Sequence, residues 1–183
     1  MLLTTLLVAD PARCATTERP DSELREALIK AIRSSDSFSD RFDAEVWLTD
    51  MSTRLQRKVP DHNERLLILK TVHYEAGRAN LPPELVLAVI DVESNFDRFA
   101  LSQAGARGLM QVMPFWLDEI GRPGDDLFDI RTNLRIGCTI LRHYLDSERG
   151  DRVKALARYN GSIGQAWYPR LVFTALSNRW FRQ

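Results

Sequence analysis

Residues 82–96 read PPELVLAVIDVESNF, and the fold that we expect follows from this stretch. Two prolines open it, and proline is tolerated in the first turn of a helix because its missing N–H has no intrahelical partner there. Apolar residues then recur at the three- and four-residue spacing of a helix that packs against a core. The sequence therefore predicts a helix that begins at the prolines and buries one side.

Glu93 is the misfit in this helix. On a wheel of about 100° per residue, it lies opposite the narrow polar stripe of the helix. The polar stripe consists of Glu84, Asp91 and Asn95. The apolar side consists of Leu85, Val86, Val89, Val92 and Phe96. Burial disfavours the charged form of a carboxyl group, so we expect the pKa of Glu93 to be raised, as suits a general acid. A buried ion pair with an arginine fits the pattern equally well, so the helix alone does not decide.

The rest of the chain also has helical rather than alternating periodicity between its turn signals. Further helices are expected over 21–34, 39–58, 61–79, 110–120, 129–148, 151–160 and from Pro169 to about Trp180. The glycines and polar residues of 99–108 predict a loop. The predicted fold class is all-α, with one domain over 61–183 and an N-terminal helical extension over 21–60.

Composition excludes several classes of protein. The 183 residues suffice for one well-filled domain, and the 25 basic and 25 acidic side chains balance. That balance gives no electrostatic reason to expect nucleic acid or an anionic membrane as a partner. The three histidines are scattered, and Cys14 and Cys138 form no metal-spaced pair, so we expect no metal. Cys138 lies on an apolar helical stripe and is expected to be a buried, inert thiol.

The N-terminus has an apolar run, MLLTTLLVA over residues 1–9, without a preceding Lys or Arg. It resembles the core of a secretory signal but is too short to span a bilayer as a helix. We interpret residues 1–20 as an atypical or truncated leader. An ordinary apolar tail is the alternative.

Four sequence motifs indicate the function. Glu93-Ser94-Asn95-Phe96 is followed by ALSQAGARGLMQVMP over 100–114, and then by NLRIG over 133–137 and ARYNG over 157–161. In this order and at these separations they resemble the soluble lytic transglycosylase family, goose-lysozyme-like muramidases of the bacterial envelope. The resemblance covers about residues 65–175. The combination of motifs is specific, although each one alone is weak.

The resemblance implies a lysozyme-like catalytic domain and a role for several residues. Glu93 would be the catalytic acid, and Tyr159 the tyrosine whose hydroxyl hydrogen-bonds that carboxyl group. The residues that would line the sugar subsites are Ser102, Gly108, Gln111 and Met113, with Gln111 as the partner of an N-acetyl group. Asn160 follows the tyrosine as it does in the family and would also bind the substrate. The next residues, Gly161-Ser162, depart from the usual small residue followed by glycine, which puts the shape of this loop in doubt.

The implied reaction cleaves the β-1,4 bond between N-acetylmuramic acid and N-acetylglucosamine in peptidoglycan without water. It leaves a 1,6-anhydro end and needs no cofactor. Glycosidases usually use two carboxylates, yet no Asp or Glu lies between Arg98 and Leu117, which favours a mechanism with Glu93 alone. A lysozyme-type hydrolase and a non-catalytic glycan-binding module remain alternatives.

Several further expectations follow from this substrate. The protein would be exported to the periplasm, where its partners are the glycan strands, and it would act as a monomer; its protein partners are unknown. Trp167 and Tyr168 either stack on sugars or close the core against the last helix.

Overall fold

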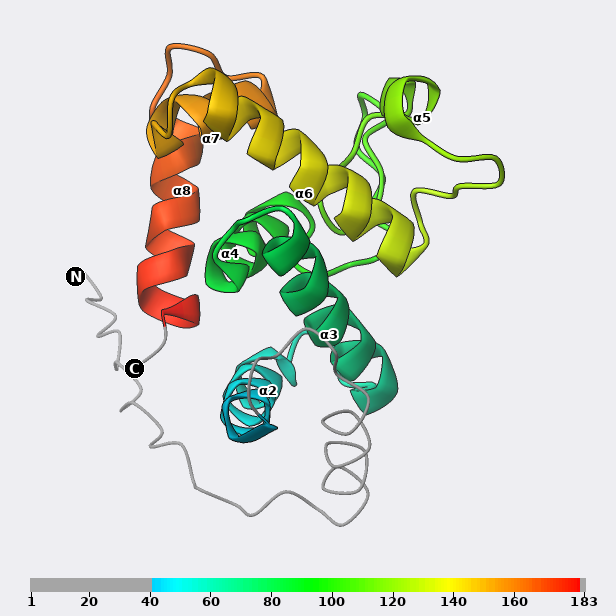
Figure 1. Cartoon of the computed structure of the whole chain (residues 1–183), viewed down its shortest axis with the longest axis vertical. Helices are drawn as coiled ribbons and strands as arrows, with labels where there is room; N and C mark the ends of the chain where they lie inside the picture. The colour runs from blue at the N-terminus through cyan, green and yellow to red at the C-terminus, as the bar shows by residue number, and fades with distance from the viewer. Residues whose placement is uncertain (1–40, 182–183) are drawn as a thin grey trace, which may run out of the picture.

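A computed structural model describes residues 41–181 of the chain (Figure 1). The proposed leader, the helix expected over 21–34 and the first part of the extension lie outside the described residues. The helices are α2 (Arg41–Leu55), α3 (His62–Arg78), α4 (Pro83–Glu93), α5 (Phe115–Ile120), α6 (Ile130–Ser147), α7 (Arg152–Asn160), α8 (Trp167–Ala175) and the π-helix η1 (Leu176–Trp180). Within residues 41–181 the chain forms no strand, only two isolated β-bridges, which confirms the all-α class.

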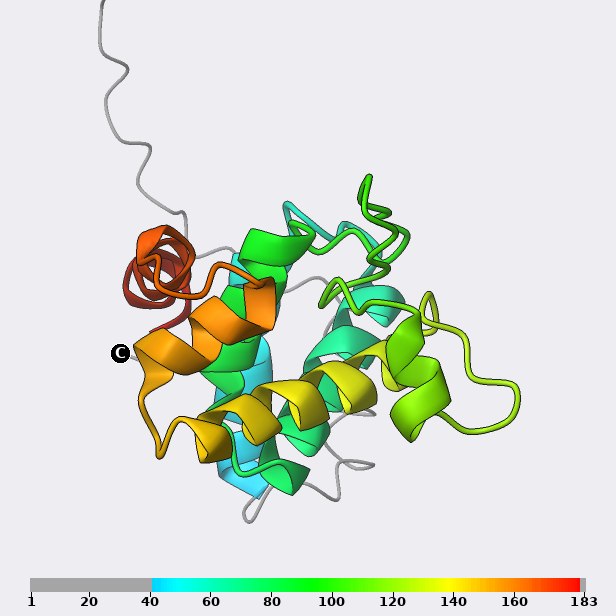
Figure 2. The ribbon, with the colours of Figure 1, turned by 90° about the horizontal axis from the view of Figure 1, so that it is seen from above.

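Helix α4 lies in the middle of the bundle, in contact with α3, α8 and η1 (Figures 1 and 2). Every residue from Leu85 to Asp91 is buried, so the helix is covered on all sides. Asp91, which the helical wheel places on the polar stripe, is only 7% exposed, so this part of the stripe is covered as well. A helix in the centre of a bundle needs apolar residues all round, and Leu87, Ala88 and Ile90 complete that surface.

The ends of the helices follow the local sequence. The side chains of Asp61, Asp129 and Asp151 accept hydrogen bonds from backbone N–H groups in the first turns of α3, α6 and α7. These N–H groups have no partner within their helix, which is why Asp is favoured at this position. Gly161 ends α7 in the left-handed conformation (φ +78°), which glycine adopts without strain.

Two predicted helix starts were wrong. The helix expected over 110–120 begins only at Phe115, because residues 108–112 form a turn in which Gln111 has a φ of +48°. Both backbone hydrogen bonds of Val112 go to Arg107, so this segment pairs with the preceding loop instead of continuing a helix. The last helix begins at Trp167, two residues before Pro169, which occupies its first turn.

The described part of the N-terminal extension shares the core of the rest of the chain. Trp47, Leu48, Met51 and Leu55 on α2 are buried in the same hydrophobic cluster as α3, α4, α6 and α8. The indole N–H of Trp47 also donates to Glu84 at the start of α4 (2.9 Å). Helix α2 therefore packs into the same core, mainly against α3, and reaches the start of α4 through Trp47.

Asp91 joins three segments at the other end of α4. Its carboxylate accepts hydrogen bonds from Lys58, which follows α2, and from Arg179 (2.6 Å) and Trp180 (2.9 Å) in η1. Burial acts to raise the pKa of Asp91, but these donors outweigh it and hold the pKa below its usual value. The ionised carboxylate thus ties the chain before α3 and the chain after α8 to the central helix.

We expect Asp91→Asn to lower the free energy of unfolding by about 2–4 kcal/mol at pH 7, because it leaves two cations without a counter-ion. The value is below that of a fully buried pair because Arg179 is half exposed. A carboxylate with a lowered pKa stabilises the fold above its unfolded-state pKa, and this stabilisation is lost as the pH falls through the folded-state pKa. Urea unfolding of the wild type should show that loss in acid, and the variant should lack it. Glu119→Gln, at an exposed position on α5, is the control.

Gly137 on α6 tests the packing under the 108–112 turn. A Cβ at this position would lie 2.5 Å from the sulfur of Met110 and 2.8 Å from its Cβ. Met110 is fully buried, so it has little room to move. We expect Gly137→Ala to destabilise the protein by about 1–3 kcal/mol.

Gly77→Ala provides the matched control, because a Cβ on this exposed residue of α3 meets nothing within 4 Å. Alanine favours a helix over glycine by about 1 kcal/mol, so this variant should be slightly more stable than the wild type. Thermal unfolding of both variants measures the difference. Equal effects of the two substitutions would contradict the tight contact between α6 and Met110.

Candidate active site

Glu93 is the last residue of α4, and the chain reverses immediately after it. Asn95 and Phe96 have φ values of +52° and +68°, which non-glycine residues seldom adopt. The buried ring of Phe96 packs against Trp180 (5.2 Å between ring centroids) and so holds this turn in place. The helix therefore ends at the residue that carries the candidate catalytic carboxyl group.

The Glu93 carboxyl group is held by two neutral donors. The hydroxyl of Tyr168 on α8 donates to its Oε1 (2.6 Å), and the side chain of Asn160 at the end of α7 also donates to it. Burial raises the pKa of Glu93, and the two hydrogen bonds oppose this shift only in part. The raised pKa predicted from the helical wheel is thus confirmed. Within residues 41–181 no arginine or lysine forms an ion pair with Glu93, so the alternative of an internal ion pair is not found.

The tyrosine that binds Glu93 is not the one expected. The hydroxyl of Tyr159 donates to the backbone carbonyl of Met110 (2.8 Å), which ties α7 to the 108–112 turn. Tyr168 is 1% exposed and donates to Glu93, so it neither stacks on a sugar nor merely fills the core. Its neighbour Trp167 is half exposed, and its indole N–H donates to Gln165. One role was predicted for both aromatic residues, but in the structure Trp167 contacts Gln165 and Tyr168 contacts Glu93.

Gly108 lies beneath the loop that follows Glu93 rather than on its surface. It is buried with a φ of +73°, and a Cβ would lie 2.4 Å from the side-chain nitrogen of Asn133 and from the carbonyl oxygen of Leu127. Only glycine allows this close approach. That Gly108 lines a sugar subsite stays a prediction. Its observed contacts fix the shape of the loop.

Asn133 on α6 organises the loop from below. Its side chain donates to the carbonyls of Arg107 and Leu127 (both 2.8 Å) and accepts from the N–H of Met110 (2.8 Å). At 1% exposed, it satisfies backbone groups that would otherwise be buried without a partner. Asn133 belongs to the NLRIG motif, but no role was predicted for it from the sequence. The signal that could have indicated its role is an amide side chain on the otherwise apolar stripe of α6.

Ser94 connects the end of α4 to the same loop, and its role was also missed. Its hydroxyl bonds to the carbonyl of Leu109 (2.8 Å), one residue from Met110. Because Ser94 adjoins Glu93 in the chain, this bond fixes the loop relative to the carboxyl group. A short polar side chain directly after a predicted helix is a common capping signal and could have indicated this contact.

The other predicted subsite residues lie on this loop. Ser102 accepts a hydrogen bond from the N–H of Ala106 (3.0 Å) and closes a tight turn. The amide nitrogen of Gln111 donates to the carbonyls of Ala100 (3.1 Å) and Gly108 (3.0 Å). Because both amide hydrogens are used, Gln111 offers a ligand its side-chain oxygen, which is an acceptor. Met113 is partly buried after the turn.

Cys138 is buried, and burial raises the pKa of its thiol far above the usual value, which confirms the expected inert cysteine. Across residues 41–181, no group of three His, Cys, Asp or Glu side chains is arranged to hold a metal ion. None of the helices in that range has the length and apolar character to cross a membrane.

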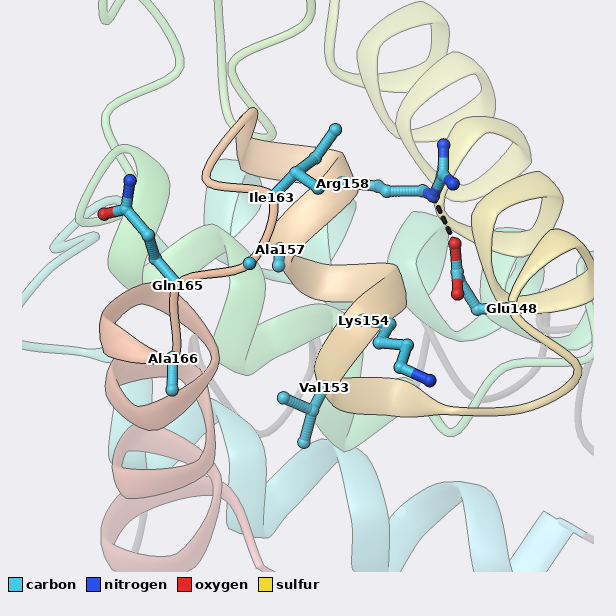
Figure 3. Close-up of a pocket in the computed structure, with 9 residues that line it drawn as sticks. Glu148, Val153, Lys154, Ala157, Arg158, Ile163, Gln165 and Ala166 are labelled. Carbon is cyan, nitrogen blue, oxygen red and sulfur yellow. Dashed lines mark hydrogen bonds and ion pairs between the residues drawn. The ribbon is translucent and has the colours of Figure 1, made fainter.

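A pocket of about 460 Å³ lies between α7 and the loop 161–166 (Figure 3). Val153, Ala157 and Ile163 line its apolar part, and Arg158 pairs with Glu148 at its edge (Figure 3). None of the predicted site residues lines this pocket. The loop 161–166 forms one wall of the pocket and connects Asn160 to α8, the helix that carries Tyr168.

Comparison with known proteins identifies the family. The family described as "Transglycosylase SLT domain" matches residues 70–170, a range that includes Glu93, Gln111 and Tyr168. A transglycosylase of the enterobacterial phage PRD1 is 35% identical over 97 residues, which are 53% of this chain and 36% of that protein. Membrane-bound lytic murein transglycosylase F of Desulfosudis oleivorans is 37% identical over 95 residues, 49% of this chain and 20% of that protein.

Longer matches have lower identity. The soluble lytic murein transglycosylase of Escherichia coli K12 is 27% identical over 137 residues, 68% of this chain but only 21% of that protein. Among solved structures, lytic transglycosylase Slt of Pseudomonas aeruginosa covers 75% of this chain and 23% of its own, with 26% identity and a TM-score of 0.48. The chain thus spans a small part of the relatives that it matches. On the family match over 70–170, the chain belongs to the transglycosylase SLT domain family.

Proposed function

We propose that this protein cleaves the glycan strands of peptidoglycan as a lytic transglycosylase, with Glu93 acting first as an acid and then as a base. The observation that carries the proposal is the partly buried carboxyl group of Glu93, which has a raised pKa and two neutral donors. Such a group can hold a proton near neutral pH and still ionise during the reaction. Membership of the SLT family supports the same substrate class.

In the first step, protonated Glu93 donates its proton to the glycosidic oxygen between N-acetylmuramic acid and N-acetylglucosamine. The C1–O bond breaks, and the 2-acetamido group of the substrate stabilises the positive charge at C1. The free side-chain oxygen of Gln111 can accept the acetamido N–H and so orient that group. This substrate-assisted step removes the need for a second carboxylate.

In the second step, the Glu93 carboxylate takes the proton from the 6-hydroxyl of the muramic acid. The 6-oxygen forms a bond to C1 and closes a 1,6-anhydro ring, so no water is consumed. Tyr168 and Asn160 donate to the carboxylate form and stabilise it between the two steps. Burial and these donors thus act in opposite directions on the pKa of Glu93, which suits a group that must both give and take a proton.

This substrate also determines where the protein would act. Peptidoglycan lies outside the inner membrane, so we propose export to the periplasm. The relatives named murein transglycosylases are consistent with action on the cell wall.

The first test is Glu93→Gln on purified peptidoglycan. The amide has the shape of the carboxyl group but cannot transfer its proton, so we expect at least a 1000-fold loss of turnover with normal folding. Glu119→Gln on exposed α5 should retain full activity. Mass spectrometry of the wild-type products should find ends lighter by one water. Reducing ends would favour a lysozyme-type hydrolase, and unchanged turnover of Glu93→Gln would refute the catalytic role.

The second test separates the two tyrosines. In Tyr168→Phe, Glu93 loses a hydrogen bond that favours its charged form, so the pKa of Glu93 rises further. Because the first step needs protonated Glu93, the alkaline limb of the pH profile of kcat/KM should move to higher pH. We also expect kcat to fall about tenfold, the cost of one hydrogen bond that stabilises the carboxylate.

Tyr159→Phe is the control for this test. Its hydroxyl donates to the Met110 carbonyl, so we expect the variant to be less stable but to keep the alkaline limb in place. If the limb moves in Tyr159→Phe and stays fixed in Tyr168→Phe, Tyr159 is the supporting tyrosine, as the sequence implied.

A further inference from the structure

Two arginines and two phenylalanines stack at the edge of the loop that follows Glu93. We call Arg98, Phe99, Arg107 and Phe128 the Arg–Phe cluster. The guanidinium of Arg98 lies 4.7 Å from the ring centroid of Phe99, and that of Arg107 lies 5.8 Å from the ring of Phe128. The two rings are 6.2 Å apart. Arg98 also donates to the carbonyl of Phe128 (3.3 Å) and so joins the two halves of the cluster.

The positive charges of this cluster are not neutralised. Within residues 41–181, neither Arg98 nor Arg107 forms an ion pair, whereas the described arginines that do are Arg54, Arg78, Arg135, Arg142, Arg158 and Arg179. Two carboxylates close in sequence to members of the cluster, Asp97 and Asp126, accept from the backbone N–H groups of Phe99 and Phe128 instead.

The contacts of the guanidinium groups favour a carboxylate ligand. The Nε atoms of both arginines are buried without a hydrogen-bond partner in the described chain. A guanidinium stacked on a ring is weakly hydrated, so less water must be removed when it binds an anion. Its planar terminal nitrogens match the two oxygens of a carboxylate.

The cluster adjoins the candidate sugar site. Arg107 precedes Gly108, and its backbone exchanges two hydrogen bonds with Val112, the neighbour of Gln111 (both 3.0 Å). Phe99 is 64% exposed and offers an apolar face on which a sugar can stack. An exposed ring next to unpaired guanidinium groups fits a sugar that carries a carboxylate.

We propose that the Arg–Phe cluster binds a carboxylate of the glycan strand and makes the protein selective for negatively charged strands. This inference rests on the proposed function. Peptidoglycan offers two sources of this group: the lactyl carboxylate of muramic acid, which is free where the peptide has been removed, and the carboxylates of the peptide stems. Neutral N-acetylglucosamine offers neither.

Three substrates distinguish the sources. The first is naked glycan strands with free lactyl carboxylates, the second is the same strands with these groups converted to methylamides, and the third is strands that carry peptide stems. For the wild type we expect KM on the charged substrates to rise with salt concentration, because salt screens the attraction, and KM on the methylamide strands to stay constant. This comparison needs no substitution.

The double variant Arg98→Gln/Arg107→Gln removes the charge. Hydrogen bonds to a charged group contribute about 1.5–3 kcal/mol, so we expect KM to rise about 10- to 100-fold on the charged substrate that the cluster recognises, with kcat nearly unchanged. Arg98→Lys/Arg107→Lys keeps the charge and should recover part of this loss. An increase on naked strands identifies the lactyl carboxylate, and an increase confined to peptide-bearing strands identifies the stem.

Two results would overturn the inference: equal KM values for wild type and double variant on all three substrates, or an equal increase on the neutral methylamide strands. If the double variant does not fold, the single variants and the salt dependence of the wild type decide. The outcome is separable from that of the proposed function. A wild type that releases no 1,6-anhydro ends from any substrate contradicts the proposed function, whereas an active wild type with an unaffected double variant contradicts only the charge recognition.

Discussion

The burial of α4 on all sides is the constraint on which the rest of the molecule depends. A central helix leaves no room for charge, yet α4 carries Asp91 and Glu93 two residues apart, on different sides. Asp91 accepts hydrogen bonds from Lys58, which precedes α3, and from Arg179 and Trp180 in η1. These donors lower its pKa, so the carboxylate stays ionised. Glu93 receives only neutral donors, and burial raises its pKa. The same helix thus holds a structural anion and a candidate proton donor, and the difference lies in the partners.

The loop after Glu93 is positioned by contacts from three directions. Ser94 binds it from α4, Asn133 from α6 and Tyr159 from α7, and all three bind backbone carbonyl groups between residues 107 and 127. Gly108 permits this because a side chain there would collide with Asn133. The segment has little regular secondary structure, so side chains from its neighbours determine its shape. Such support gives an irregular loop the rigidity that a substrate-binding site needs.

Much of the fold was predictable from local pattern. The aspartates before α3, α6 and α7 and the glycine after α7 marked helix ends that the structure confirms, because capping depends on residues within one turn. Residues 110–112 were predicted as the start of a helix because the apolar residues of 110–120 have helical spacing, yet 110–112 belong to a turn. The burial of Asp91 was missed for a related reason: a wheel assigns faces but cannot tell how many faces are covered.

The sequence by itself determined that the described chain is helical and that Glu93 is a carboxyl group on an apolar side. Both follow from spacing along one helix, since residues three and four apart share a face. Only the tertiary structure decided which tyrosine reaches Glu93. Tyr168 lies 75 residues away, and its hydroxyl meets the carboxyl group because α8 packs against α4. Tyr159 lies on α7 and meets Met110 instead. Contacts over such separations depend on how helices pack together, and periodicity within each helix carries no information about that packing.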